Sequence, residues 1–87
     1  MAYEVVWHTK VKADLAAIAK PDAARIIARV KEHLTQNPSG TGMPLKGLFK
    51  GLHRLRVGAY RVIYAIDHAE RRVLVLHVQH RKDVYRE

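Results

Sequence analysis

The chain has 87 residues, of which 48% are apolar and 28% charged, a composition typical of one globular domain and not of a disordered segment. It contains no cysteine, which excludes disulfide scaffolds, Cys-type zinc sites and thiol nucleophiles. Sixteen Lys and Arg against eight Asp and Glu give a net charge of +8, which favours a polyanionic partner such as nucleic acid or an acidic protein. Since no apolar run approaches the ~20 residues of a membrane span and no signal-peptide pattern opens the chain, we expect a single cytoplasmic domain, residues 1–87, with no membrane partner.

The first half of the chain predicts one strand followed by two helices. Residues 3–8 are rich in β-branched and aromatic side chains with alternating faces, which indicates a strand. An apolar repeat at helical spacing begins at Val11, with Thr9 positioned to cap that helix. Pro21 suits the first turn of a second helix, which we expect to run to about Gln36. The short join between the two predicts a helical hairpin.

The second half of the chain predicts three strands. The segments rich in β-branched and aromatic residues are Leu52–Val57, Tyr60–Asp67 and Arg72–Gln79. Gly58-Ala59 separates the first two, and Gly at the first central position suits a two-residue type II′ turn. Residues 73–76 are apolar on both faces, so we expect the third strand to be central in the sheet. The order predicts an α+β domain: an N-terminal strand, a helical hairpin and a three-stranded antiparallel meander forming one sheet, with the helices on one face.

The two-residue turn also fixes the register of the first hairpin. It places Val57 opposite Tyr60 and Arg56 opposite Arg61, and period-two alternation puts Arg54 on the same face as that arginine pair. The apolar face of the hairpin must be covered by the helices. The arginines therefore line the opposite face, which no helix covers. Like charges directly opposite one another destabilise a strand pair. A single arginine here could simply lie on a solvated strand face. Three converging arginines instead favour a phosphate ligand, which guanidinium groups bind bidentately.

Several segments of the second half resemble a known toxin family. Residues 52–64 (LHRLRVGAYRVIY) resemble the central hairpin of the RelE branch of the RelE/ParE toxin superfamily, as do residues 44–47 (PLKG) and 78–86 (VQHRKDVYR). The element order agrees over essentially the whole chain. The resemblance implies a RelE-like fold and the toxin of a type II toxin–antitoxin module. RelE-like members cut mRNA in the ribosomal A site, whereas ParE-like members poison DNA gyrase.

The resemblance also implies roles for individual residues. RelE-type toxins carry basic residues at the matching positions and a tyrosine at that of Tyr85. Arg61 and Arg81 would stabilise the scissile phosphate, and Tyr85 would transfer a proton or stack on a base. The substrate-binding set comprises Arg54, Arg56, Lys46, Lys82 and His80. The best-known RelE pattern has lysines at the first two of these positions, and because arginine does not lose its proton in practice, we do not expect a general base there.

The chemistry of RNA cleavage indicates which residues could act as the acid and the base. The 2′-hydroxyl beside the scissile phosphate is the nucleophile, so a metal-free enzyme must deprotonate it, neutralise the phosphorane and protonate the 5′-oxygen. Tyr85 and either His80 or His77 are the candidates for acid and base. The six histidines form no recognisable metal-ligand pattern, so we predict that the protein uses no metal and no cofactor.

The resemblance implies three partners: a RelB-like antitoxin, the ribosome and mRNA. A strongly basic chain suits an acidic antitoxin segment. We therefore predict a metal-independent, ribosome-dependent mRNA endonuclease. Two alternatives remain open, a ParE-like inhibitor of DNA gyrase and a non-catalytic homologue that binds only its antitoxin.

Overall fold

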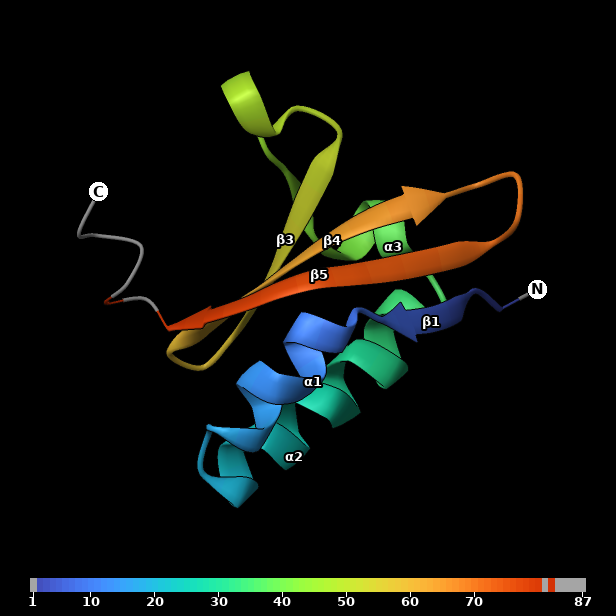
Figure 1. Cartoon of the computed structure of the whole chain (residues 1–87). Helices are drawn as coiled ribbons and strands as arrows, with labels where there is room; N and C mark the ends of the chain where they lie inside the picture. Colours follow the sequence, from blue (N-terminus) through green and yellow to red (C-terminus); the bar gives the residue numbers. More distant parts are fainter. Residues whose placement is uncertain (1, 81, 83–87) are drawn as a thin grey trace.

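The computed structural model describes residues 2–80 and 82, which form one mixed five-stranded sheet with helices packed on one face (Figure 1). The strand order is β1-β5-β4-β3-β2. The strands are β1 (Glu4–Trp7), β2 (Met43–Pro44), β3 (Leu52–Val57), β4 (Tyr60–Asp67) and β5 (Arg72–His80). The helical elements are α1 (Thr9–Ala16), α2 (Lys20–Arg29), a π-helical turn at Val30–Leu34, α3 (Pro38–Thr41) and a 3₁₀ turn at Gly47–Phe49. The predicted α+β architecture is confirmed.

The antiparallel meander has the predicted register. Val57 pairs with Tyr60 and Arg56 with Arg61. Gly58 has a φ of 59°, whereas Ala59 has a negative φ, which agrees with a type II′ turn. β5 is an interior strand with neighbours on both sides, as expected, because β1 pairs in parallel with the edge that β4 leaves free. The short edge strand β2, which pairs antiparallel with β3, was not predicted.

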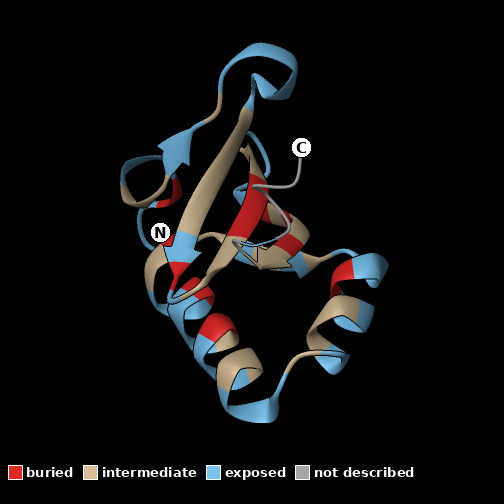
Figure 2. Ribbon diagram, turned by 90° about the vertical axis from the view of Figure 1, so that its left-hand side faces the viewer, coloured by how far each residue is buried: buried red, intermediate tan, exposed pale blue. Residues whose placement is uncertain are grey.

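The two helices pack against the sheet through a core of apolar side chains. Figure 2 marks in red the buried residues of both the helices and the strands. Helix α1 contributes Val11, while α2 and the π-helical turn contribute the apolar stripe of Ile26, Val30 and Leu34, all fully buried. The sheet contributes the buried side chains of Val57, Val62, Tyr64, Val73, Val75 and Val78. These positions leave the opposite face of the meander uncovered by helix.

The helix boundaries differ from the prediction at two ends. His8, rather than Thr9, caps α1, since its Nδ1 atom accepts a hydrogen bond from the Lys10 N–H over 3.1 Å. Helix α2 begins at Lys20 with Pro21 in its first turn, where a missing N–H costs nothing. Its helical path continues to Leu34, two residues short of the predicted end.

Tyr64 anchors the connection that leads to the edge strand. Its buried hydroxyl donates a hydrogen bond to the Pro38 carbonyl over 2.7 Å. Burial raises the pKa of Tyr64 to about 12, although a backbone hydrogen bond at Gly42 acts in the opposite direction. Gly42 lies so close that a Cβ there would sit 2.6 Å from the Arg54 carbonyl oxygen and would also clash with the Tyr64 hydroxyl. This packing holds β2 beside β3 and fixes where residues 45–51 leave the sheet.

Within the part of the chain described here, no helix is long and apolar enough to cross a membrane.

Candidate functional site

The open face of the β3–β4 hairpin carries three arginines. Arg54 and Arg56 lie on β3 and Arg61 on β4, and Arg56 faces Arg61 directly across the pair. Neither of the ion pairs found among the described residues involves them. Asp67 falls on the same face of β4, but it lies six residues, or about 20 Å, along the strand. The hairpin therefore presents concentrated positive charge to solvent.

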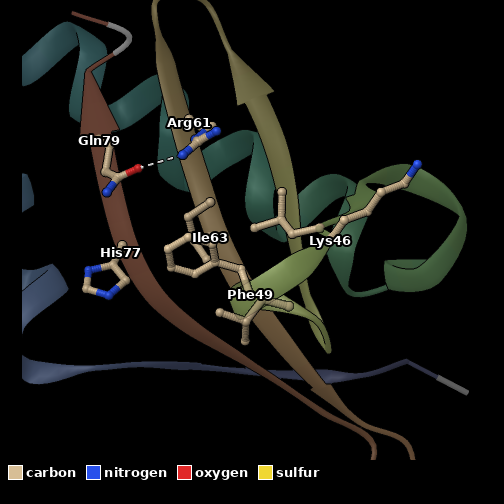
Figure 3. A pocket seen from close by; sticks show the side chains of 8 residues that line it. Lys46, Phe49, Arg61, Ile63, His77 and Gln79 are labelled. Carbon is tan, nitrogen blue, oxygen red and sulfur yellow. Dashed lines mark hydrogen bonds between the residues drawn. The ribbon is translucent and has the colours of Figure 1, made fainter. Parts of the chain in front are cut away.

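Arg61 is the most constrained of the three arginines. Its side chain is partly buried, and one terminal nitrogen donates a hydrogen bond to Gln79 Oε1 over 3.2 Å (Figure 3). Its Nε atom is buried and has no hydrogen-bond partner among the described residues. Gln79 lies directly opposite Arg61 on β5, so a side chain of the neighbouring strand holds this guanidinium in place. A guanidinium whose orientation is already fixed loses less side-chain entropy on binding phosphate than one that rotates freely.

Arg61 forms one wall of a hollow of about 380 Å³. The hollow lies on the arginine face, between the strands and the loop that follows β2. Its lining combines four apolar side chains with four polar ones: Leu45, Phe49, Leu52 and Ile63, and Lys46, Arg61, His77 and Gln79. Lys46 lies at the rim, and its amine is directed away from Arg61 (Figure 3). The volume lies within the ~300–1,000 Å³ typical of small-molecule sites.

A β-bulge decides which β5 residues reach this face. Tyr64 pairs with Val75, but its neighbour Ile63 pairs with His77, so Leu76 has no partner on β4. The extra residue reverses the alternation beyond it. His77 and Gln79 consequently face the arginines.

The bulge also moves one predicted substrate-binding residue away from the site. His80 lies opposite Tyr60 on the helix-covered side, with the two rings perpendicular and their centroids 5.1 Å apart. Its Nδ1 accepts a hydrogen bond from the Lys82 N–H over 3.1 Å, and the Lys82 side chain is exposed. Strict alternation from the core positions of β5 would have placed His80 with the arginines.

The structure thus brings together part of the predicted set. Arg54, Arg56, Arg61 and Lys46 lie on the open face or its rim, together with His77. Arg81 and Tyr85 lie outside the described residues. Sequence reasoning missed Gln79 and the apolar residues of the hollow, because neither the bulge nor the path of the loop after β2 has a clear signal in the sequence.

The chemistry that this face offers is anion binding. Three guanidinium groups and a lysine at the rim present many hydrogen-bond donors and no acceptor. Among residues 2–80 and 82, no three His, Asp or Glu side chains converge on a point that could hold a metal ion.

Comparisons with known proteins agree in family and in fold. The family model for the ParE toxin of the type II toxin–antitoxin system parDE matches residues 5–85. Toxin RelE of Mycobacterium tuberculosis is 37% identical over 84 residues, which span 97% of this chain and 87% of that protein. Toxin RelG of the same organism is 33% identical over 86 residues, 99% of each chain.

Two solved structures are similar along nearly the whole chain. A chain of the toxin–antitoxin complex RelBE2 from Mycobacterium tuberculosis superimposes with a TM-score of 0.87 at 29% identity, covering 92% of this chain and 99% of that one. A chain of the archaeal RelE–RelB complex from Pyrococcus horikoshii gives a TM-score of 0.75 at 27% identity, covering 93% and 97%.

Proposed function

Because this chain belongs to the RelE/ParE superfamily of toxins from type II toxin–antitoxin systems, we propose that it stops translation by cutting mRNA in the ribosomal A site. The observation that carries the proposal is the open face of the β3–β4 hairpin, with three arginines on one side of the sheet and one of them held by Gln79. An RNA backbone supplies the repeated negative charges that such a face binds.

Arg61 is the residue we assign to the scissile phosphate. In cleavage by 2′-hydroxyl attack, negative charge accumulates on the non-bridging oxygens as the phosphorane forms. A guanidinium that is already oriented stabilises this charge without reorganising during the step. Arg54 and Arg56, on the neighbouring strand, suit adjacent phosphates. They stay protonated and so position the backbone without moving protons.

The proton transfers need groups other than the arginines. We assign one proton transfer to Tyr85, because nearby arginines would favour its phenolate form. We assign stabilisation of the phosphate to Arg81 as well as to Arg61. Both assignments come from the RelE pattern. His77 lines the hollow beside Arg61, which supports it as our second candidate for acid or base.

The partner that we propose for the free toxin is a RelB-like antitoxin. The similar structures from Mycobacterium tuberculosis and Pyrococcus horikoshii are complexes of a toxin with its antitoxin. The net charge of +8 suits an acidic segment of such a partner.

A gyrase inhibitor is the second candidate function, because the matching family model describes ParE toxins. An inhibitor that acts through protein contacts does not need a phosphate-binding face. The arginine hairpin and the two relatives named RelE and RelG therefore favour the nuclease.

Substitution Arg61→Ala separates the two functions. Primer extension on translated mRNA should show breaks within A-site codons for the wild type, and a rate lower by about 10- to 150-fold for the variant, since a hydrogen bond to a charged group contributes ~1.5–3 kcal/mol. Arg25→Ala removes an exposed arginine from the helix side and is the matched control. Wild-type protein that inhibits gyrase and leaves mRNA intact would refute the nuclease assignment.

A further inference from the structure

We propose that the hollow beside Arg61 binds one nucleobase of the RNA, with Phe49 as its stacking platform and Gln79 as the residue that reads the base edge. The inference rests on the proposed RNA-cleaving function and adds a base-binding site to the phosphate-binding face. The resemblance described above gives neither residue a role, although Gln79 lies in the matching segment 78–86.

The apolar wall of the hollow has the form of a stacking surface. Phe49, on the 3₁₀ turn after β2, remains 57% exposed and lines the hollow together with Ile63, which is only 4% exposed (Figure 3). Leu45 and Leu52 complete this wall. An exposed aromatic ring at the wall of a hollow gains from stacking with any base, because every base has a π-face. The volume of about 380 Å³ is large enough for a single planar ring system.

The opposite wall presents hydrogen-bond donors. The guanidinium of Arg61 can only donate, so the atom of Gln79 that meets it must be the amide oxygen. The amide nitrogen of Gln79 is consequently turned away from Arg61, toward His77 (Figure 3). It makes no hydrogen bond to another described residue. A base that offers an acceptor, such as guanine through O6 or N7, satisfies this nitrogen.

The position of Gln79 links the base to the phosphate. One side of its amide holds the guanidinium proposed to bind the scissile phosphate, and the other side faces the hollow. A base bound there belongs to a nucleotide whose phosphate lies within reach of Arg61. Filling the hollow with the right base therefore also fixes the arginine.

A nucleobase fits the hollow better than an apolar side chain of an antitoxin. An apolar group would cover the Phe49 ring but would leave the Gln79 nitrogen and the His77 ring without partners, and an unpartnered buried polar group is costly. A planar ring with polar edges satisfies both walls.

Single-turnover cleavage on ribosomes programmed with defined mRNAs tests the proposal. The A-site nucleotides beside the scissile phosphate carry each of the four bases or, separately, no base. With the wild type, one abasic position should slow cleavage by about 5- to 150-fold, the range expected for one base stacked on an aromatic side chain. Phe49→Ala should slow cleavage of the intact mRNA by a similar factor. The cleavage rate of this variant should not change further at the abasic position. Leu48→Ala, in the same turn but 99% exposed and outside the hollow, is the matched control.

Gln79→Glu tests the reading of the base edge. The carboxylate still accepts a hydrogen bond from Arg61, but the donor group that faced the hollow becomes an acceptor. The ratio of cleavage rates between bases with an acceptor edge and bases with a donor edge should therefore change by about tenfold or more. A residue that acted only on the fold would slow all four mRNAs equally. Circular dichroism on each variant shows whether the fold is retained.

The outcomes separate this inference from the proposed function. If the wild type cuts at A-site codons but its rate is insensitive to every abasic position, the nucleobase site is wrong and the nuclease stands. If Phe49→Ala instead weakens binding to the antitoxin while cleavage is unchanged, the hollow is an antitoxin contact. If the wild type cuts no mRNA, the proposed function itself fails.

Discussion

Replacing Arg56 by glutamine should make the protein more stable and less active. Arg56 and Arg61 are directly opposite one another next to a two-residue turn. The turn-closing pair in such a hairpin is hydrogen-bonded, so the next pair out belongs to the closer class, with Cα atoms ~4.5 Å apart. Like charges in that position cost ~0.2–1 kcal/mol. Arg56 is exposed, so solvent screening keeps the gain in this modest range.

Thermal unfolding measures the effect on stability. For a domain of this size, 1 kcal/mol shifts the Tm by ~4–8 °C, so Arg56→Gln should raise the Tm by a few degrees. The gain should shrink at high salt, since the Debye length falls from ~30 Å at 0.01 M to ~3 Å at 1 M. Lys50→Gln lowers the net charge equally but lies on the loop outside the strand pair, and it is the matched control.

Activity should move in the opposite direction. Loss of one charge-assisted phosphate contact should lower the cleavage rate by about 10- to 150-fold. A fall in the Tm, or an equal rise with Lys50→Gln, would show that no local repulsion exists between the two arginines. A more stable variant with full cleavage activity would remove Arg56 from the substrate site.

Three further substitutions test the core and the chemistry. The pKa of Tyr64 is about 12 in the folded state and near 10 when unfolded, so unfolding between these pH values releases a proton and the free energy of unfolding should fall as the pH rises. Tyr64→Phe should abolish this alkaline loss of stability in urea titrations. At neutral pH the same variant should lose ~1–3 kcal/mol, because the Pro38 carbonyl is left without its hydrogen bond. Gly42→Ala forces a Cβ against the Arg54 carbonyl and should lower the free energy of unfolding by ~1–3 kcal/mol, an effect that an unchanged denaturation midpoint would contradict. Tyr85→Phe should slow single-turnover cleavage at least tenfold, within the ~10²–10⁴-fold typical of a lost proton-transfer group, with RNA binding nearly unchanged; equal rates would exclude Tyr85 from the chemistry.

Local chemistry alone determined much of this protein. Gly58 allows a backbone conformation that other residues disfavour, and it sets the turn. Once the turn is fixed, period-two alternation places Arg54, Arg56 and Arg61 on one face. The apolar spacing in α1 and α2 then covers the other face with helices. Each step depends on residues close in the chain, so the sequence is sufficient.

The tertiary structure decided which residues complete the site. The bulge at Leu76 shifts the alternation of β5 by one residue, which brings Gln79 to Arg61 and turns His80 to the helices. The loop after β2 brings Phe49 to the hollow, and the segment before it is packed against the sheet by Tyr64 and Gly42. A bulge and a loop path reflect packing between segments far apart in the chain, and no local residue preference specifies either of them.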